Sequence, residues 1–126
     1  MNAPASFPMA EWLGFSVTQD ADGRLYRLAF NETHIGNPAI RALHGGVIAA
    51  FLELSMQTEL RALQGPQAGA TITVAIDYLQ SSRAQDMTAR VRAVRIGRRL
   101  AFLEADGWQD DATRLVASAR ACLKLA

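Results

Sequence analysis

Apolar and polar residues alternate along six segments of this 126-residue chain, in the pattern of half-buried strands. Two segments come first, near residues 15–18 and 26–30, and the turn sequence at 20–23 separates them. Four more follow, at 71–78, 88–93, 100–108 and 115–124, with turns at Gly97 and at Asp110–Asp111. Short turns between successive strands favour an antiparallel sheet.

One long segment has the pattern of a helix instead. We predict a helix from about Gly45 to Leu63, whose first half is almost unbroken in its apolar character, and Gly65–Pro66 ends it. Residues 31–43 before it form an irregular connection. Because this helix is the only apolar cover available, we predict an α+β fold in which a curved antiparallel sheet wraps around one long helix.

Composition limits the class of protein. Half of the residues are hydrophobic and a fifth are charged, so we expect a true hydrophobic core. We predict a single domain over residues 1–126, of which residues 1–10 form a loose N-terminal arm. The net charge of +1 argues against a general binder of polyanions.

Cellular location is predicted from the same data. The lone Cys122 rules out a disulfide framework and fits a reducing cytosol. We expect no signal peptide, and the longest apolar run is too short to span a bilayer, so we predict a cytoplasmic protein without membrane contacts.

The most informative residues lie where the helix begins. His44 is followed by Gly45 and Gly46, and paired glycines at a helix start leave backbone N–H groups bare and able to hold a polarised carbonyl oxygen. Further along, Glu53 is a single carboxylate among apolar neighbours, costly to bury without a partner or a task. Donors and a carboxylate are the minimum equipment for hydrolysing an acyl group.

Helix geometry separates these two groups within one chain. Gly46 and Glu53 are seven residues apart, so they share a face but lie roughly 10 Å apart along the axis. Two such helices packed antiparallel would bring the glycine end of one to the glutamate of the other. Ala49 and Ala50 between them are small enough to admit a partner helix or a thin substrate. We therefore predict a symmetric dimer with two shared sites.

Two further sets of residues bear on ligand binding: the arginines around Gly97 and the two histidines. Arg95, Arg98 and Arg99 flank Gly97, where guanidinium groups suit phosphate contacts, and the absence of interleaved aromatic residues disfavours nucleic acid. His34 lies in the irregular connection and is expected to be solvated. With no further histidine beyond His34 and His44, we expect no metal site.

Three segments resemble a known family. LHGGVIAAFLE at 43–53, ITVAIDYLQ at 72–80 and RIGRRLAF at 95–102 are similar to the hotdog-fold acyl-CoA thioesterases of the phenylacetate-pathway type, and the resemblance covers about 13–125. It implies a hotdog fold, homodimers often paired into homotetramers, and hydrolysis of a thioester. Coenzyme A is then part of the substrate, and no separate cofactor is needed.

The resemblance also implies roles for single residues. The Gly45 N–H would bind the thioester oxygen, and Glu53 of the other subunit would act as general base or nucleophile. His44 would orient groups near the sulfur, and Thr71 would help to place water. The substrate-binding residues would be Asn37, Gly46, Gln57 and Thr71, and the coenzyme A-binding residues would be Ser81, Ser82, Arg83, Arg95, Gly97, Arg98 and Arg99.

The chain departs from the family pattern just before the helix. Arg41 stands where many relatives carry glycine, and Pro38 where many carry Asn or Gln, so Asn37 would substitute from a shifted loop. Two alternatives to a thioesterase stay open at this point. One is a hotdog enoyl-CoA hydratase or dehydratase, and the other is a non-catalytic acyl-CoA binding module.

Overall fold

The computed structural model describes residues 8–126, and the six strands of its main sheet and its long helix lie close to the predicted positions. Residues 31–43, predicted as an irregular connection, instead contain a 3-10 helix and two short strands. The elements are, in chain order, α1 (Pro8–Leu13), β1 (Phe15–Asp20), β2 (Gly23–Leu28), the 3-10 helix η1 (Glu32–His34), β3 (Ile35–Asn37), β4 (Ala42–Leu43), α2 (Gly45–Gln64), β5 (Ala70–Tyr78), β6 (Met87–Ile96), β7 (Leu100–Trp108) and β8 (Ala117–Lys124).

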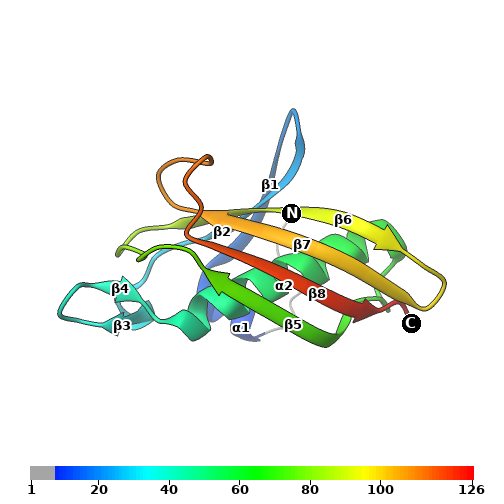
Figure 1. Cartoon of the computed structure of the whole chain (residues 1–126), viewed down its shortest axis with the longest axis horizontal. Helices are drawn as coiled ribbons and strands as arrows, with labels where there is room; N and C mark the ends of the chain where they lie inside the picture. The colour runs from blue at the N-terminus through cyan, green and yellow to red at the C-terminus, as the bar shows by residue number, and fades with distance from the viewer. Residues whose placement is uncertain (1–7) are drawn as a thin grey trace.

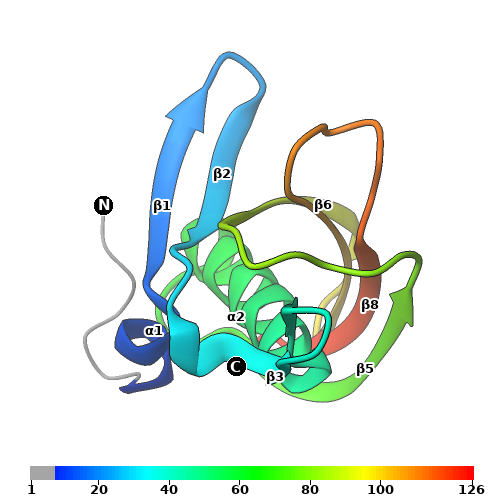
Figure 2. The ribbon, with the colours of Figure 1, turned by 90° about the vertical axis from the view of Figure 1, so that its left-hand side faces the viewer.

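The sheet curves around α2. Within the described residues its strand order is β1-β2-β6-β7-β8-β5, and every neighbouring pair is antiparallel. Figure 1 shows α2 lying along the inner face of the sheet, and Figure 2, seen along the helix, shows the sheet bending around it. The predicted curved antiparallel sheet around one long helix is therefore confirmed.

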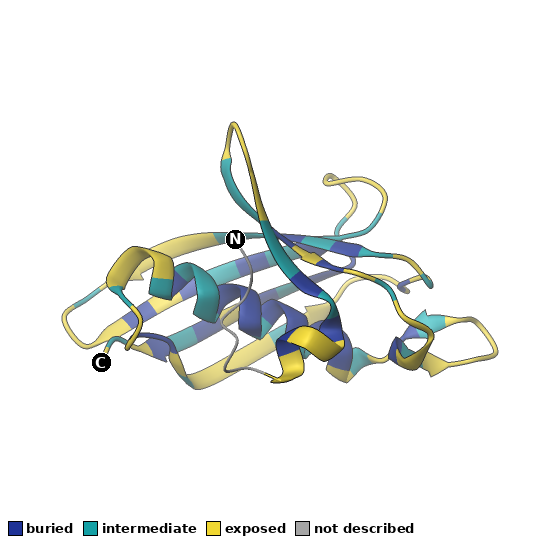
Figure 3. Ribbon diagram, turned by 180° about the vertical axis from the view of Figure 1, so that it is seen from behind, coloured by how far each residue is buried: buried dark blue, intermediate teal, exposed yellow. Residues whose placement is uncertain are grey.

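Small side chains at the sheet centre let the helix approach closely. The inner face of β7 and β8 carries Ala101, Ala105, Ala117 and Ala119, all buried. The larger apolar residues of α2 fill the space above them, and they include Phe51, Leu52, Met56 and Leu60, none of which is exposed. Figure 3 shows this buried face in dark blue on the strands and on α2.

One side of α2 stays uncovered. Figure 2 shows α1 on one flank of the helix and β5, an edge strand, on the other. Between them Gly46 is exposed, while Ala49, Ala50, Glu53 and Gln57 are half-buried. This row of small and polar side chains, which we call the open stripe, is the face predicted to meet a second copy.

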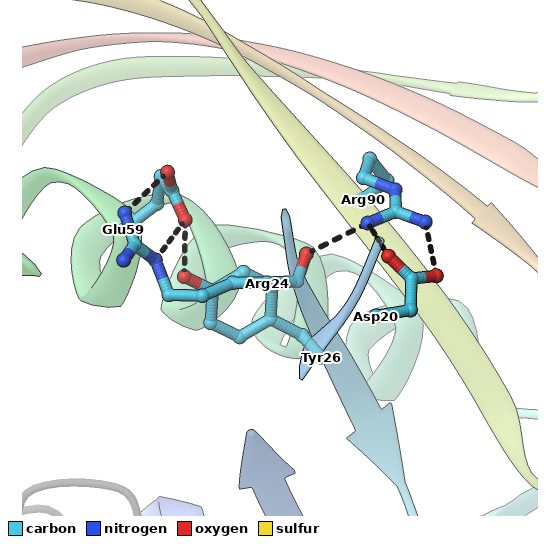
Figure 4. Close-up of polar contacts among 5 residues, drawn as sticks. All are labelled: Asp20, Arg24, Tyr26, Glu59 and Arg90. Atoms are coloured by element: carbon cyan, nitrogen blue, oxygen red, sulfur yellow. Dashed lines mark hydrogen bonds and ion pairs between the residues drawn. The ribbon is translucent and has the colours of Figure 1, made fainter. Parts of the chain in front are cut away.

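The β1–β2 hairpin rises away from the sheet and is held by two charged contacts (Figure 4). Arg24 donates to both carboxylate oxygens of Glu59 at 2.9 Å, and the Tyr26 hydroxyl donates to one of them at 2.5 Å. At the tip, Arg90 on β6 donates to both oxygens of Asp20, at 3.0 and 2.8 Å. The hairpin is thus pinned to α2 on one side and to β6 on the other.

The start of the described chain differs from the prediction. Pro8–Ala10 were predicted to belong to a loose arm, but they are part of α1, whose Ala10 and Leu13 are buried. Residues 1–7 of the predicted arm lie outside the described residues. A helix of six residues is too short to produce a clear apolar period in the sequence.

His34 is also not where the sequence placed it. It is completely buried rather than solvated. Its Nδ1 accepts from the Asn31 N–H at 3.1 Å as part of a capping box, and its Nε2 lies 3.0 Å from the carbonyl oxygen of Trp12. The Trp12 and His34 rings meet edge to face with centroids 4.7 Å apart. Both ring nitrogens have partners, so burial costs the imidazole no hydrogen bond.

Candidate functional site at the start of the central helix

His44 caps α2 with its side chain. Its Nδ1 accepts from the Gly46 N–H at 2.8 Å, and its carbonyl oxygen accepts from the Val47 N–H at 2.9 Å. Because Nδ1 is an acceptor, the neutral ring carries its proton on Nε2. A Cβ at position 46 would lie 3.0 Å from His44 Nδ1, so glycine there makes room for the capping ring.

The cap leaves Gly45 as the donor. The next two amides are taken by His44, whereas within residues 8–126 no acceptor is recorded for the Gly45 N–H. Its carbonyl oxygen accepts from the Tyr78 hydroxyl at 2.7 Å. A bare N–H at the positive end of a 20-residue helix is a ready donor to a carbonyl oxygen that gains negative charge.

Three of the predicted residues meet further along α2. Gln57 Nε2 donates to Thr71 Oγ1 at 3.0 Å and lies 3.5 Å from Glu53 Oε2. Glu53 makes no ion pair with any described residue, although it is half-buried on the open stripe. Gly45 and Glu53 are eight residues apart on one helix, about 12 Å along its axis. One chain therefore holds the donor and the carboxylate apart.

Two hollows flank the helix start. The first, called the α1 groove, has a volume of about 320 Å³, reaches His44 and Gly46, and is lined by Met9, Trp12, Thr33, Ile35, Val47 and Ala50. The second, called the β5 groove, has a volume of about 310 Å³, adjoins Gly45, and is lined chiefly by Leu43, Ile48, Tyr78, Gln80, Ser81 and Ser82.

The residues predicted to bind coenzyme A fall into two separate places. Residues 81–83 precede β6, and the turn at 95–99 follows it, so the ten residues of β6 put them about 33 Å apart at opposite ends of the sheet. Arg95, Gly97, Arg98 and Arg99 together line a hollow of about 410 Å³. Within one chain, residues 81–83 and the arginines at 95–99 are therefore too far apart to bind the same phosphate group.

Several predicted binding residues already have partners. The Ser82 hydroxyl is buried and accepts from the Leu43 N–H at 2.9 Å, so it holds the strand that leads to His44. Ser81 is exposed, as is Arg83, which lies 3.7 Å from Asp110.

The loop before the helix is a small ribbon of β3 and β4. Asn37 lies there and accepts from the Ala39 N–H at 3.1 Å, outside both grooves. Arg41, the departure from the family pattern, makes a two-pronged contact with Glu32 at 3.1 and 2.7 Å. Its backbone has φ of 51°, a conformation that glycine adopts with less strain.

The resemblance implies a role for Tyr78 only as the first residue of a coenzyme A-holding stretch at 78–83, and its contact with the helix start was not predicted. Tyr78 stands at the end of β5 and touches Gly45, since a Cβ at 45 would lie 3.4 Å from the Tyr78 hydroxyl oxygen. A signal existed: Tyr78 alternates in phase with Ile76 and Val74, which would have placed it on the helix-facing side. Trp12 and Met9 carried no signal, because α1 was not predicted.

The described residues contain neither a cluster of metal-binding side chains nor a membrane-spanning helix. No three His, Cys, Asp or Glu side chains in 8–126 gather as a metal site would require. In the same part of the chain, neither helix combines the length and the apolar character needed to cross a bilayer.

Comparison with known proteins identifies the family. Residues 33–123 match the family model of the acyl-CoA thioesterase N-terminal domain. A solved protein of the thioesterase superfamily is 27% identical and superposes with a TM-score of 0.87, covering 95% of this chain and 90% of that one. No curated protein sequence matches this chain.

Two more distant solved structures share the fold. A Bacillus halodurans protein, solved with CoA, is 18% identical with a TM-score of 0.85, covering 97% of this chain and 80% of that one. A mutant of the phenylacetic acid degradation protein PaaI from Thermus thermophilus is 20% identical with a TM-score of 0.79, covering 95% and 100%. With the sheet, the helix and the capped glycine in place, the chain belongs to the hotdog-fold acyl-CoA thioesterase family.

Proposed function

We propose that this protein hydrolyses acyl-CoA thioesters at two sites, each shared between two copies of the chain. The observation that carries the proposal is the separation on α2: Gly45 offers a bare N–H, and the unpaired carboxylate of Glu53 lies about 12 Å away on the same helix. Family membership supports thioester chemistry, and the Bacillus halodurans relative solved with CoA supports the nature of the leaving group.

A symmetric dimer would complete each site. The open stripe of α2 and the unpaired edge of β5 lie side by side, so a second copy docked antiparallel can cover both. Glu53 of one copy would then face Gly45 of the other. The residues at 81–83 of one copy and the arginine turn of its mate would likewise come to the same end, and could hold one coenzyme A between them.

The proposed reaction follows from these groups. The Gly45 N–H donates to the thioester oxygen and stabilises the negative charge that develops there. Glu53 of the other copy takes a proton from water as the water oxygen bonds to the carbonyl carbon, or attacks that carbon itself to form an anhydride that water then opens. The carbon–sulfur bond breaks, and the thiolate of coenzyme A leaves and takes up a proton.

Supporting roles go to the residues around these two groups. Gln57 and Thr71 would hold Glu53 and the water, in keeping with their mutual hydrogen bond. His44 would chiefly keep the Gly46 amide occupied, so that Gly45 remains the donor, with its Nε2–H directed to the substrate.

A thiol-release assay across aryl, short and long acyl-CoA substrates tests the activity. Release of coenzyme A from at least one class is expected. Binding of coenzyme A without release from any substrate would favour a non-catalytic module, and water addition to an enoyl-CoA would favour a hydratase. A cytoplasmic location and the pairing of dimers into a tetramer remain predictions. Analytical ultracentrifugation of the purified protein would measure its oligomeric state.

Mixing two inactive variants tests the shared site. Gly45→Pro removes the N–H alone, because proline suits the first position of a helix and the preceding His44 has φ of −61° and ψ of 135°, as a residue before proline requires. A mixed dimer of Gly45→Pro and Glu53→Gln chains contains one intact site and should recover activity. No recovery in a proven mixed dimer would contradict a shared site.

A further inference from the structure

We infer that the acyl group of the substrate lies in the α1 groove, with Trp12 as the residue that limits its size, while the pantetheine arm of coenzyme A lies in the β5 groove. This assignment rests on the proposed function and adds to it the direction in which the thioester lies. The two grooves meet at the helix start, where Gly46 belongs to the α1 groove and Gly45 to the β5 groove. A thioester held by the Gly45 N–H would extend one arm into each.

The α1 groove has the chemistry of an acyl site. Among residues 8–126, no Asp, Glu, Lys or Arg lines it. The side chains of Met9 and Trp12 are large and apolar, yet they are 50% and 46% exposed, so covering them removes apolar surface from water. The described part of its wall has one hydroxyl, Thr33 Oγ1, which already donates to Asn31 Oδ1 at 2.8 Å. The groove therefore suits an uncharged hydrocarbon group.

Trp12 is a fixed wall. Its carbonyl oxygen accepts from His34 Nε2 at 3.0 Å, and its ring packs edge to face on the same buried imidazole. The His34 carbonyl oxygen in turn accepts from the His44 N–H at 2.8 Å. One buried residue thus ties the groove wall to the residue that caps the helix, which fixes the distance from Trp12 to the donor.

The β5 groove has the opposite character. Ser81 brings a hydroxyl to it. Tyr78 and Gln80 donate to backbone carbonyls at 2.7 to 3.1 Å, and their oxygens still accept, so the groove can match the amides and hydroxyl of a pantetheine arm. Beyond Ser81 the surface continues into a polar hollow lined by Gln80, Arg83, Asp110 and Arg114. An arm leaving Gly45 in this direction would reach arginine side chains suited to phosphates.

The volume of the α1 groove sets an expected size. At about 320 Å³ it lies at the lower end of the roughly 300–1,000 Å³ typical of small-molecule sites, so we expect a short or medium-length acyl group. Ala50 forms part of the wall from α2, and its small side chain helps to leave the space open.

The test compares specificity constants across straight-chain acyl-CoA substrates of increasing length. In the wild type, kcat/KM should pass through an optimum and fall for longer chains, since a hydrophobic pocket changes the rate by about tenfold or more per misfitting methylene. Trp12→Ala should move the optimum to longer chains, and Ala50→Val to shorter ones. Trp108→Ala, on the outer face of β7, is the matched control and should keep the wild-type ranking.

Free coenzyme A separates the two grooves, because it lacks the acyl group. Its inhibition constant should stay within about twofold in Trp12→Ala, whereas Ser81→Leu should raise it with the acyl ranking unchanged. An unchanged ranking in both Trp12→Ala and Ala50→Val, or a ranking altered by Ser81→Leu, would overturn the assignment while leaving the thioesterase proposal in place. A wild type that hydrolyses none of the substrates would contradict both.

Discussion

Glu53 and Glu59 lie six residues apart on α2, and their surroundings are opposite in kind. Glu59 accepts from Arg24 at both oxygens and from the Tyr26 hydroxyl, so this half-buried carboxylate has all the partners it needs. Within residues 8–126, Glu53 has only an amide nitrogen of Gln57 as a partner, at 3.5 Å, and it faces the uncovered side of the helix. The comparison shows that the carboxylate paired with a cation stabilises the fold, whereas the unpaired carboxylate is free to take part in a reaction.

The shifted pKa values of Glu59 and Tyr26 reflect this structural role. Burial alone would raise the pKa of its carboxyl, but the hydrogen bonds from Arg24 and Tyr26 outweigh burial and hold it below the ordinary value of 4.5. Burial, and then the hydrogen bond to Glu59, raise the pKa of the Tyr26 hydroxyl far above its usual range. The cluster is therefore ionised as an ion pair with a neutral phenol at every pH at which the protein would work.

The largest effect on catalysis is expected from removing the Gly45 N–H, the hydrogen-bond donor proposed to act together with Glu53. Gly45→Pro should reduce kcat by about 10²–10³-fold, the scale of losing one oxyanion donor. Gly45→Ala is the matched control, since it keeps the N–H and its Cβ would meet the Tyr78 hydroxyl oxygen at an ordinary 3.4 Å. Steady-state kinetics with a good acyl-CoA substrate decide the matter, and equal activity in the two variants would remove Gly45 from the mechanism.

Glu53→Gln should reduce turnover by at least about 10²-fold, as expected for a positioned acid–base group, and should leave the thermal midpoint nearly unchanged. Single-turnover hydrolysis in ¹⁸O-labelled water separates its two possible roles. Label found in Glu53 would indicate direct attack, and unlabelled Glu53 would indicate a general base. Near-normal turnover in this variant would contradict both.

Glu59→Gln should show the reverse pattern. Losing charge-assisted hydrogen bonds should lower the free energy of unfolding by roughly 2 kcal/mol, measured by urea titration, while kcat of the folded protein is retained. Glu32→Gln is the control, because its pair with Arg41 is exposed on both sides and should contribute almost nothing. A large loss of kcat in Glu59→Gln at full folding would break the distinction between the two glutamates.

Two tyrosines extend the comparison. Tyr78→Phe removes the hydrogen bond to the Gly45 carbonyl, and kcat should fall by about 3–10-fold, the range of one neutral hydrogen bond. Tyr26→Phe removes the hydrogen bond to Glu59 and should lower stability instead. Denaturation midpoints measured beside kinetics distinguish the two, and a change confined to the midpoint in Tyr78→Phe would make that residue purely structural.

The smallest effect concerns pH. The unfolded chain binds a proton at Glu59 more tightly than the folded chain does, so the stabilisation is complete above pH 4.5 and is lost as pH falls through the lower folded pKa. The difference in urea midpoint between wild type and Glu59→Gln should therefore shrink on acidification below 4.5. A constant difference from pH 6 to pH 3 would show that the pair contributes through packing alone.

The sequence predicted the architecture because each strand shows its inner face as a period of two and α2 is the one long apolar run. It could not predict how Thr71 reaches Gln57. Strict alternation puts Thr71 opposite to Val74, but a register shift between Thr71 and Thr73 turns Thr71 to the inner side. A bulge of this kind depends on pairing with β8 and leaves no mark on the local pattern.

The sequence predicted single residues of the site but not the contacts between them. The glycines and Glu53 were visible from composition and spacing, whereas the capping role of His44, the buried bridge of His34 and the tyrosine at the end of β5 arise from contacts between segments far apart in the chain. The Arg24–Glu59 pair joins residues 35 positions apart, and no local signal distinguishes Glu59 from a solvated helix glutamate.

Tyr78, at the end of the edge strand, has a consequence for how the reaction would respond to dilution. β5, the edge strand proposed to pack against a second copy, also holds the Gly45 peptide through the Tyr78 hydroxyl. Dimer formation would thus fix the position of the Gly45 N–H and at the same time bring in Glu53 of the other copy. Below the dissociation constant of the pair, the hydrolysis rate would then rise with the square of the chain concentration, so that scarce, newly made chains would leave thioesters untouched.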